Sequence, residues 1–198
     1  MRLLTVTGAV LTIVVFAFVP ARADADGHVN FFLGQKSLSS SDWEPLEKQL
    51  EFGAVMSFGQ ESWPVHIAVD VLTSTDETTL YDPFLGNVTL TGSTFEIDLG
   101  VRKIWKKGRV LPYIGGGLGV IGAGLEADAG FASTDASDVG FGLWADAGVF
   151  FRLGSHFNLG FDLRYSNADV DVDFGNGIVA ENVAAGGFGY GVLLGFGW

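Results

Sequence analysis

The sequence contains no cysteine, so no disulfide bond contributes to its fold. Charged residues are also scarce, at 17% of the chain, and the mean hydropathy is +0.35. After residue 23, however, no apolar run approaches the roughly 18 residues that a membrane-spanning helix requires. The hydrophobicity is therefore spread over short segments, which argues against a bundle of membrane helices.

Basic residues are the scarcer charge, with 11 Lys and Arg against 23 Asp and Glu. Nucleic acid is excluded as the expected partner, because Lys and Arg are the residues that neutralise phosphates. What the chain has in excess is glycine and phenylalanine, with 29 and 17 residues. Together with the hydropathy, this composition departs from that of an average soluble domain.

The N-terminal segment has the form of an export signal. Arg2 precedes an apolar run from Leu3 to Val19, and Ala21-Arg22-Ala23 matches a small-x-small cleavage site. An uncleaved membrane anchor is the weaker alternative, because the run is short and holds three threonines. We expect cleavage after Ala23, with residues 1–23 as the signal peptide and residues 24–198 as one β-barrel domain.

The clearest periodicity lies in the stretch Gly187–Trp198. Odd positions are glycine except Leu193, which leaves one face nearly empty, and a strict period of two predicts a strand. A tilted strand of about this length spans a bilayer, where backbone polar groups require a closed barrel. The apolar face should meet lipid, and it carries Phe188, Tyr190, Val192, Leu194, Phe196 and Trp198.

Seven further segments show a period of two, separated by alternately short and long connections. The pattern predicts an all-β fold, an eight-stranded antiparallel up-and-down transmembrane β-barrel. A soluble β-sandwich or lipocalin-like barrel is the alternative, and it would need a large apolar interior. The facing of the fifth segment stays open because of its glycine-rich centre. The segments are 28–37, 50–58, 64–72, 93–104, 110–122, 139–152, 156–166 and 187–198, with long loops at 38–49, 73–92, 123–138 and 167–186.

Charge and aromatic residues divide between the two expected ends. Most acidic residues fall in the four long loops, whereas the second short turn holds Lys106, Lys107 and Arg109. The acidic end should face away from the cell. An interfacial aromatic girdle is expected at the other end, formed by Trp63, Trp105, Phe151, Phe157 and Trp198.

Several stretches carry a resemblance to a known family. They are Ala21-Arg22-Ala23, Gly100–Lys103 leading to Leu111–Gly119, Phe161–Ser166, and the terminal aromatic residue. With these the chain resembles the small eight-stranded outer-membrane barrels of Gram-negative bacteria, the group of OmpX, NspA and the OmpA membrane domain. The resemblance implies that the last strand is read by the barrel-assembly machinery. The residues of this assembly signal would be Tyr190, Val192, Leu194, Phe196 and Trp198.

If the apolar faces meet lipid, the opposite faces place ten polar side chains in the lumen. Buried charges must be paired, and eight-stranded barrels have interiors just wide enough for side chains. We expect a salt-bridged plug rather than a general acid/base pair or a proton relay. The ten residues are Lys36, Glu51, His66, Asp70, Glu96, Asp98, Arg102, Asp146, Asp162 and Arg164.

A register for the sixth and seventh segments follows if Arg152 faces His156 across their short turn. Asp146 then faces Asp162, and Trp144 faces Arg164. We expect Arg164 to bridge the two carboxylates, with Trp144 beneath its guanidinium in a cation–π contact.

Two other kinds of site are weighed and set aside. Lipid A modification by His and Ser lacks support, because His66 and Ser57 would lie in the lumen near the inner end and no His-x-Ser occurs. Asp169–Asp173 resembles the start of a calcium loop, but Phe174 and Ala180 stand where Gly and Glu are required. A continued strand is the preferred interpretation, with weak divalent-cation binding as the alternative. No catalytic, cofactor-binding or metal residue is predicted.

The sequence thus predicts a non-enzymatic protein of the outer membrane of a Gram-negative bacterium, reached after export to the periplasm. Its functions would be envelope structure or surface adhesion, through four acidic loops above a plugged lumen. A narrow channel for small or hydrophobic solutes and, less favoured, a lipid A-modifying enzyme are the alternatives. Expected partners are outer-membrane lipid, lipopolysaccharide and the barrel-assembly machinery, and the protein is expected to be a monomer without cofactors.

Overall fold

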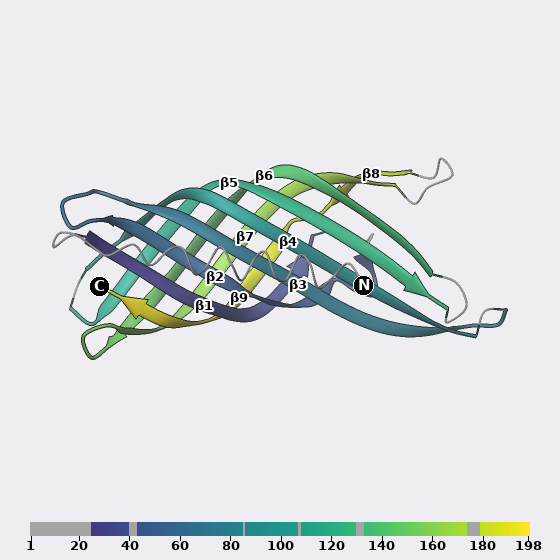
Figure 1. The fold of residues 1–198 in the computed structure, drawn as a ribbon, viewed down its shortest axis with the longest axis horizontal. Coiled ribbons are helices and arrows are strands. Elements are labelled where there is room, and N and C mark those ends of the chain that lie inside the picture. The colour runs from purple at the N-terminus through teal and green to yellow at the C-terminus, as the bar shows by residue number, and fades with distance from the viewer. Residues whose placement is uncertain (1–24, 40–42, 85, 107, 130–132, 174–178) are drawn as a thin grey trace.

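The computed structural model describes residues 25–39, 43–84, 86–106, 108–129, 133–173 and 179–198, and they form a β-barrel (Figure 1). In these ranges no helix is long and apolar enough to cross a membrane. The strands are β1 (Ala25–Leu38), β2 (Lys48–Gln60), β3 (His66–Asp82), β4 (Gly86–Ile104), β5 (Val110–Asp128), β6 (Ser133–Leu153), β7 (Phe157–Asp173), β8 (Val179–Ala184) and β9 (Gly187–Gly197).

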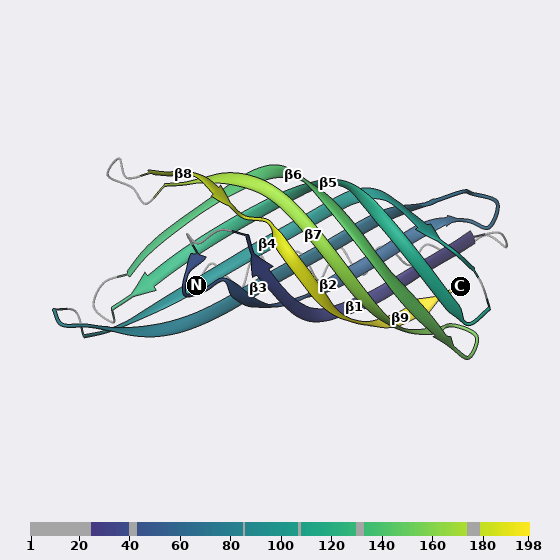
Figure 2. The same cartoon turned by 180° about the vertical axis from the view of Figure 1, so that it is seen from behind.

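Eight strands close the barrel, because β9 pairs with both β1 and β7 while β1 to β7 pair in chain order. On β9, Leu194 lies opposite Phe31 of β1 and Leu159 of β7. The ninth strand, β8, is short, and among the described residues it pairs with β7 alone. All pairings are antiparallel, and Figure 2 shows β7, β9 and β1 side by side on the rear wall. The predicted eight-stranded up-and-down barrel is confirmed.

Burial alternates along the strands as the period of two requires. Along β9 every odd residue from Gly187 to Gly197 is buried and every even one is exposed. Glycine is needed on the inner face because the lumen is crowded: a Cβ on Gly191 would lie 2.5 Å from the Leu33 carbonyl oxygen and 2.7 Å from the Phe32 ring. On β5, whose facing the sequence left open, Tyr113 points inward and Ile114 outward.

The two ends of the barrel differ. One end, called the turn end below, holds the short connections 61–65, 105–109 and 154–156. The C-terminus also lies at this end, on the left in Figure 1. At the opposite end, called the hairpin end, strands continue well past the barrel and the β3–β4 hairpin reaches farthest (Figure 1).

Three of the four predicted long loops are therefore wrong in extent. Most of 73–92 and 123–138 is strand, since β3 pairs with β4 as far as Asp82 opposite Gly86, and β5 with β6 as far as Asp128 opposite Ser133. Part of 167–186 is also strand, in β7 and β8. Backbone pairing continues here without an apolar face, so the alternation that marked the other strands is missing. The first loop is mainly a connection, as predicted.

The extensions form a four-stranded protruding sheet, defined here as residues 76–82, 86–92, 125–128 and 133–136 of β3 to β6. It stands clear of the barrel because β2 pairs with β3 only up to Leu50 opposite Thr75. On the other side, β7 pairs with β6 only up to Ala168 opposite Gly142. Within the described part of the chain, the protruding sheet therefore has one edge on β3 and another on β6 that pair with no further strand.

Candidate functional site

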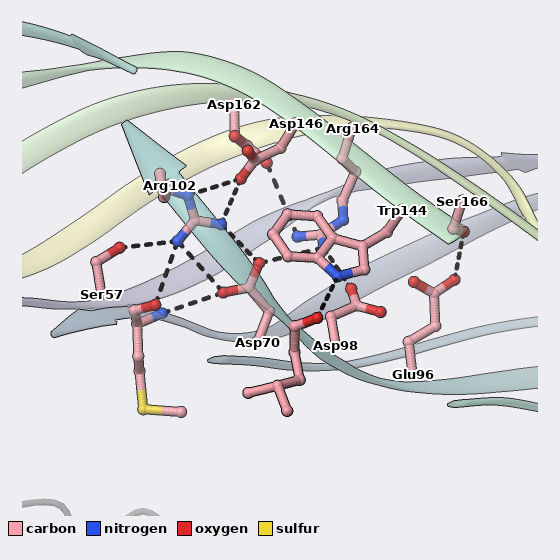
Figure 3. A network of polar contacts seen from close by, with 12 residues as sticks. Ser57, Asp70, Glu96, Asp98, Arg102, Trp144, Asp146, Asp162, Arg164 and Ser166 are labelled. Carbon is pink, nitrogen blue, oxygen red and sulfur yellow. Dashed lines mark hydrogen bonds and ion pairs between the residues drawn. The ribbon is translucent and has the colours of Figure 1, made fainter. Parts of the chain in front are cut away.

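The centre of the lumen is organised around Arg102 of β4, whose side chain is fully buried (Figure 3). Its Nη2 lies 2.8 Å from Asp70 Oδ2, and its Nε donates to Asp146 Oδ2 at 2.9 Å. Nη1 donates to Ser57 Oγ at 2.9 Å and to the Met56 carbonyl at 3.2 Å. Arg102 therefore links β2, β3 and β6 across the interior.

A second guanidinium, that of Arg164 on β7, shares a carboxylate with the first. Arg164 Nη2 lies 2.8 Å from Asp98 Oδ2 and 3.3 Å from Asp70 Oδ2, so Asp70 contacts both arginines. Nη1 lies 3.8 Å from Asp162, which also accepts a hydrogen bond from the Tyr113 hydroxyl. Charge-assisted pairs of this kind are the strong hydrogen bonds of a protein interior.

Closer to the hairpin end lies a third cationic group, the ammonium of Lys36. It pairs with Glu96, which also accepts a hydrogen bond from Ser166 Oγ at 2.8 Å (Figure 3 shows the latter contact). Glu51 is buried beside this ion pair, and its Oε2 has no hydrogen-bond partner among the described residues. Lys36 is 2% exposed and Glu51 is 1% exposed, so water does not screen these charges.

The turn end of the lumen holds a separate polar group around Asp26. His66 Nε2 and Lys106 Nζ each lie 2.5 Å from Asp26 Oδ2. His28 is fully buried and stacks on Phe150, with ring centroids 5.1 Å apart. His66 is therefore held by a carboxylate from β1, apart from the two arginines.

Two buried apolar clusters accompany the ion pairs. In one, Phe150 stacks on Tyr113 with centroids 4.5 Å apart, and the cluster also contains Phe32, Val55, Leu72, Ile104, Leu111 and Leu193. On the hairpin side, Trp43 packs with Leu38, Ile121, Ala123, Ala168, Val170 and Ala185. Trp43 is 1% exposed, and its Nε1 donates to the Ala184 carbonyl at 2.8 Å. The connection between β1 and β2 thus closes the hairpin end.

All ten residues predicted for the lumen are buried. Asp70, Asp98, Asp146 and Asp162 lie with Arg102 and Arg164, while Lys36 lies with Glu96. Within this set, six carboxylates accompany three permanent cations. The described residues contain no group of three or more histidine, aspartate or glutamate side chains placed to hold a metal ion. The side chains of Asp169 to Asp173, other than buried Val170, lie outside the described part, so the calcium-loop alternative is not tested.

A family model described as outer membrane protein beta-barrel domain matches residues 9–196. The chain belongs to this family. No curated protein sequence matches it. A member of this family resides in the outer membrane of a Gram-negative bacterium, so the apolar outer faces of the strands meet lipid.

Solved structures of three bacterial proteins share the fold. Neisserial surface protein A is 17% identical, with a TM-score of 0.50 over 86% of this chain and 96% of that protein. Ail of Yersinia pestis, in complex with the heparin analogue sucrose octasulfate, is 12% identical with a TM-score of 0.61 over 88% and 99%. OprG of Pseudomonas aeruginosa is 12% identical with a TM-score of 0.58 over 88% and 96%.

The register predicted between β6 and β7 of this outer-membrane barrel is wrong by two residues. Arg152 lies opposite Asn158, and Leu153 opposite Phe157, so the turn is Gly154-Ser155-His156. Gly154 has a φ of 74°, which places it inside the turn and moves the centre to Ser155. The shift keeps every side chain on its predicted face.

The shift changes the partners inside the lumen. Asp146 lies opposite Arg164, and Asp162 opposite Gly148. Arg102, which belongs to β4, takes the place predicted for Arg164: it pairs with Asp146, and its Cζ lies 5.6 Å from the centre of the Trp144 ring. Contacts across the lumen join strands that are not neighbours in the sheet, and strand pairing alone does not predict them.

Sequence reasoning missed three residues that shape the site. Trp43 was assigned to a polar loop, although a lone tryptophan among polar residues is a signal of burial. Asp26 falls before the predicted start of the first strand. Tyr113 lies on the strand whose facing was left open. His66 and Ser57, both expected in the lumen, do not face each other, because Ser57 lies opposite Ala68 and bonds to Arg102.

The lipid-facing side of β9 provides a test of the membrane assignment. Leu194 lies midway along the strand and is 49% exposed. We expect Leu194→Arg to lower the free energy of unfolding in lipid vesicles by roughly 2–4 kcal/mol, because the bilayer centre solvates the guanidinium poorly. Asn87→Arg, on the exposed protruding sheet, is the control and should unfold like the wild type in a urea titration. Equal destabilisation by the two variants would contradict the assignment.

Proposed function

We propose that this protein is a non-enzymatic surface barrel, with a lumen that serves as structure and a protruding sheet that contacts the exterior. The observation that carries this proposal is the filled interior, in which three cations and six carboxylates are buried together with two apolar clusters. Arg102 and Phe150 are both fully buried. Such an interior favours attachment or envelope structure over transport.

The charge of the protruding sheet supports a cationic partner. The register aligns Glu77 of β3, Thr91 of β4 and Glu126 of β5 in one row across the sheet, and both glutamates are exposed. Ail, which shares the fold, binds a heparin analogue that is a polyanion. Exposed carboxylates repel a polyanion. We therefore assign to this sheet the opposite preference, for a basic protein surface.

The test compares adhesion of cells that display the protein to surfaces coated with polylysine and with heparin. We expect binding to polylysine that weakens as salt is raised, and none above background to heparin. The double variant Glu77→Gln with Glu126→Gln removes two exposed carboxylates of the protruding sheet. It should weaken polylysine binding by about tenfold, since each exposed charge contributes on the order of 0.5–1 kcal/mol.

The matched control is Glu61→Gln, an exposed residue in the connection between β2 and β3 at the turn end. With the hairpin end facing outward, this substitution lies on the periplasmic side and should leave adhesion unchanged. Stronger binding to heparin than to polylysine, or a double variant that adheres as well as the wild type, would overturn the assignment.

A lipid A-modifying enzyme is the less favoured alternative. His66 is bound by Asp26 near the turn end, and Ser57 is bound by Arg102, so neither forms a nucleophile and base pair with the other. We expect mass spectra of lipid A to be the same with and without expression of the protein. A new lipid A species that depends on expression would refute the non-enzymatic proposal.

The proposal also includes the signals for export and for assembly into the membrane. Residues 1–23, proposed as a cleaved export signal, lie outside the described part of the chain. On β9 and at the residue that follows it, Tyr190, Val192, Leu194, Phe196 and Trp198 are 39–60% exposed, where an assembly machine can read them before the barrel closes. We propose this face as the signal for the barrel-assembly machinery, with the mature protein a monomer.

A further inference from the structure

On the lipid-facing side of β5 and β6, several side chains are small. Across most of the lipid-facing surface, called the lipid-facing belt below, bulky side chains lie opposite one another, as Leu194 does with Phe31 and Leu159. On β5 and β6, Gly116 lies opposite Ala145 instead, and Ala147 follows on the same face. The outer surface therefore dips between the bulky residues on either side.

Side-chain exposure marks the same depression. Leu159 of β7 is 42% exposed, because Phe151 of β6 and Leu194 of β9 lie opposite it and cover its flanks. Leu118 and Leu143, which lie opposite each other on β5 and β6, are 69% and 65% exposed, and Phe141 is 86% exposed. These side chains stand as ridges above a floor of small residues.

An open groove of about 600 Å³ lies beside Leu118 and Leu143 on the outer wall. Its floor and sides include Gly117, Leu118, Leu143, Ala145, Tyr165 and Asn167. Asn167 is exposed and lies opposite Leu143, one residue before the pairing of β6 with β7 ends. The groove is thus apolar along its length and offers a carboxamide at the end nearer the protruding sheet.

We propose that this groove binds one acyl chain of an outer-leaflet lipopolysaccharide. The groove is continuous with the lipid-facing belt, so hydrocarbon chains already surround it and a chain lying in it gains contacts that a flat wall does not give. The Asn167 amide lies where the polar part of an outer-leaflet glycolipid begins, given the outward hairpin end proposed above. A phospholipid of the inner leaflet would approach from the turn end, where the groove has no polar group.

The decisive experiment fills the groove and counts bound lipid. Purified, delipidated protein is mixed with lipid A or with phosphatidylethanolamine in detergent micelles, and bound lipid is measured by native mass spectrometry. We expect the wild type to retain lipid A in preference to phosphatidylethanolamine. Ala145→Phe should lower the retained lipid A by about fivefold, because the ring occupies part of the groove and the acyl chain loses dispersion contacts there.

The matched control is Ala54→Phe, which adds the same ring to the outward face of β2, where Phe31 and Val71 lie opposite. It should retain lipid A like the wild type, and both variants should show the heat-dependent gel shift of a folded barrel. Equal retention by the two variants, or by the two lipids, overturns the proposal. A wild-type dimer that Ala145→Phe converts to a monomer would assign the groove to a second copy. Neither readout depends on the adhesion proposed above.

Discussion

Replacing Arg102 with methionine is expected to lower the free energy of unfolding by roughly 3–5 kcal/mol, because it leaves buried carboxylates without their cation. Asp70 and Asp146 both pair with this guanidinium, and all three residues are 3% exposed or less. Methionine fills a similar volume, so the loss reports mainly on charge and hydrogen bonding. The measurement is urea unfolding of the folded protein in lipid vesicles.

Two further variants separate this effect from a general loss of packing. Arg109→Met, at an exposed position in the turn between β4 and β5, should change the free energy by less than about 0.5 kcal/mol. Adding Asp146→Asn to Arg102→Met should recover part of the lost stability, because one uncompensated charge is removed. An Arg102→Met variant as stable as the wild type would show that the lumen charges are not a structural network.

Truncating Trp43 to alanine is expected to cost about 3–5 kcal/mol, as for other large core side chains. The indole is buried among residues of β1, β5 and β7, and it also donates a hydrogen bond to the Ala184 carbonyl. The residue lies in a connection between strands, where substitutions are usually tolerated. A large loss from this position would therefore identify the connection as the apolar cap of the lumen.

Trp43→Phe divides the contribution of Trp43 into packing and hydrogen bonding. This variant keeps an aromatic ring in the cluster but loses the indole hydrogen-bond donor. It should therefore lower the free energy of unfolding by about 1 kcal/mol more than a substitution that changes only the shape of a core side chain. Glu44→Ala, at the exposed neighbouring position, is the control and should be close to neutral. If Trp43→Ala unfolds at the same urea concentration as Glu44→Ala, Trp43 does not cap the barrel.

The architecture was predictable because lipid imposes one rule on every spanning strand: apolar side chains alternate with those that face the lumen. The alternation of glycine with bulky residues in 187–198 and the charged residues on the opposite faces of the other strands could be assigned from sequence alone. All ten predicted lumen residues are buried for this reason. The rule ends at the membrane surface, so the pairing of Thr79 with Thr89 in the protruding sheet had no signal in the alternation.

Partner choice inside the lumen was not predictable. Arg102 and Asp146 lie on β4 and β6, and Asp98 and Arg164 lie on β4 and β7, so each pair meets across the interior. Such contacts depend on strand tilt and stagger, which a linear pattern does not encode. The turn at Gly154 shows how sensitive the partners are, because a register shift of two residues places Arg164 instead of Asp162 opposite Asp146.

Conductance of the purified wild-type protein in planar lipid bilayers tests the central claim most directly. The lumen contains ion pairs around Arg102 and Arg164 together with apolar clusters at Phe150 and Trp43. Because these side chains fill the lumen in our account, folded protein that shows the heat-dependent gel shift should give no stable open level at any moderate voltage. A reproducible open level of constant conductance, present in the wild type and absent without protein, would contradict the closed lumen.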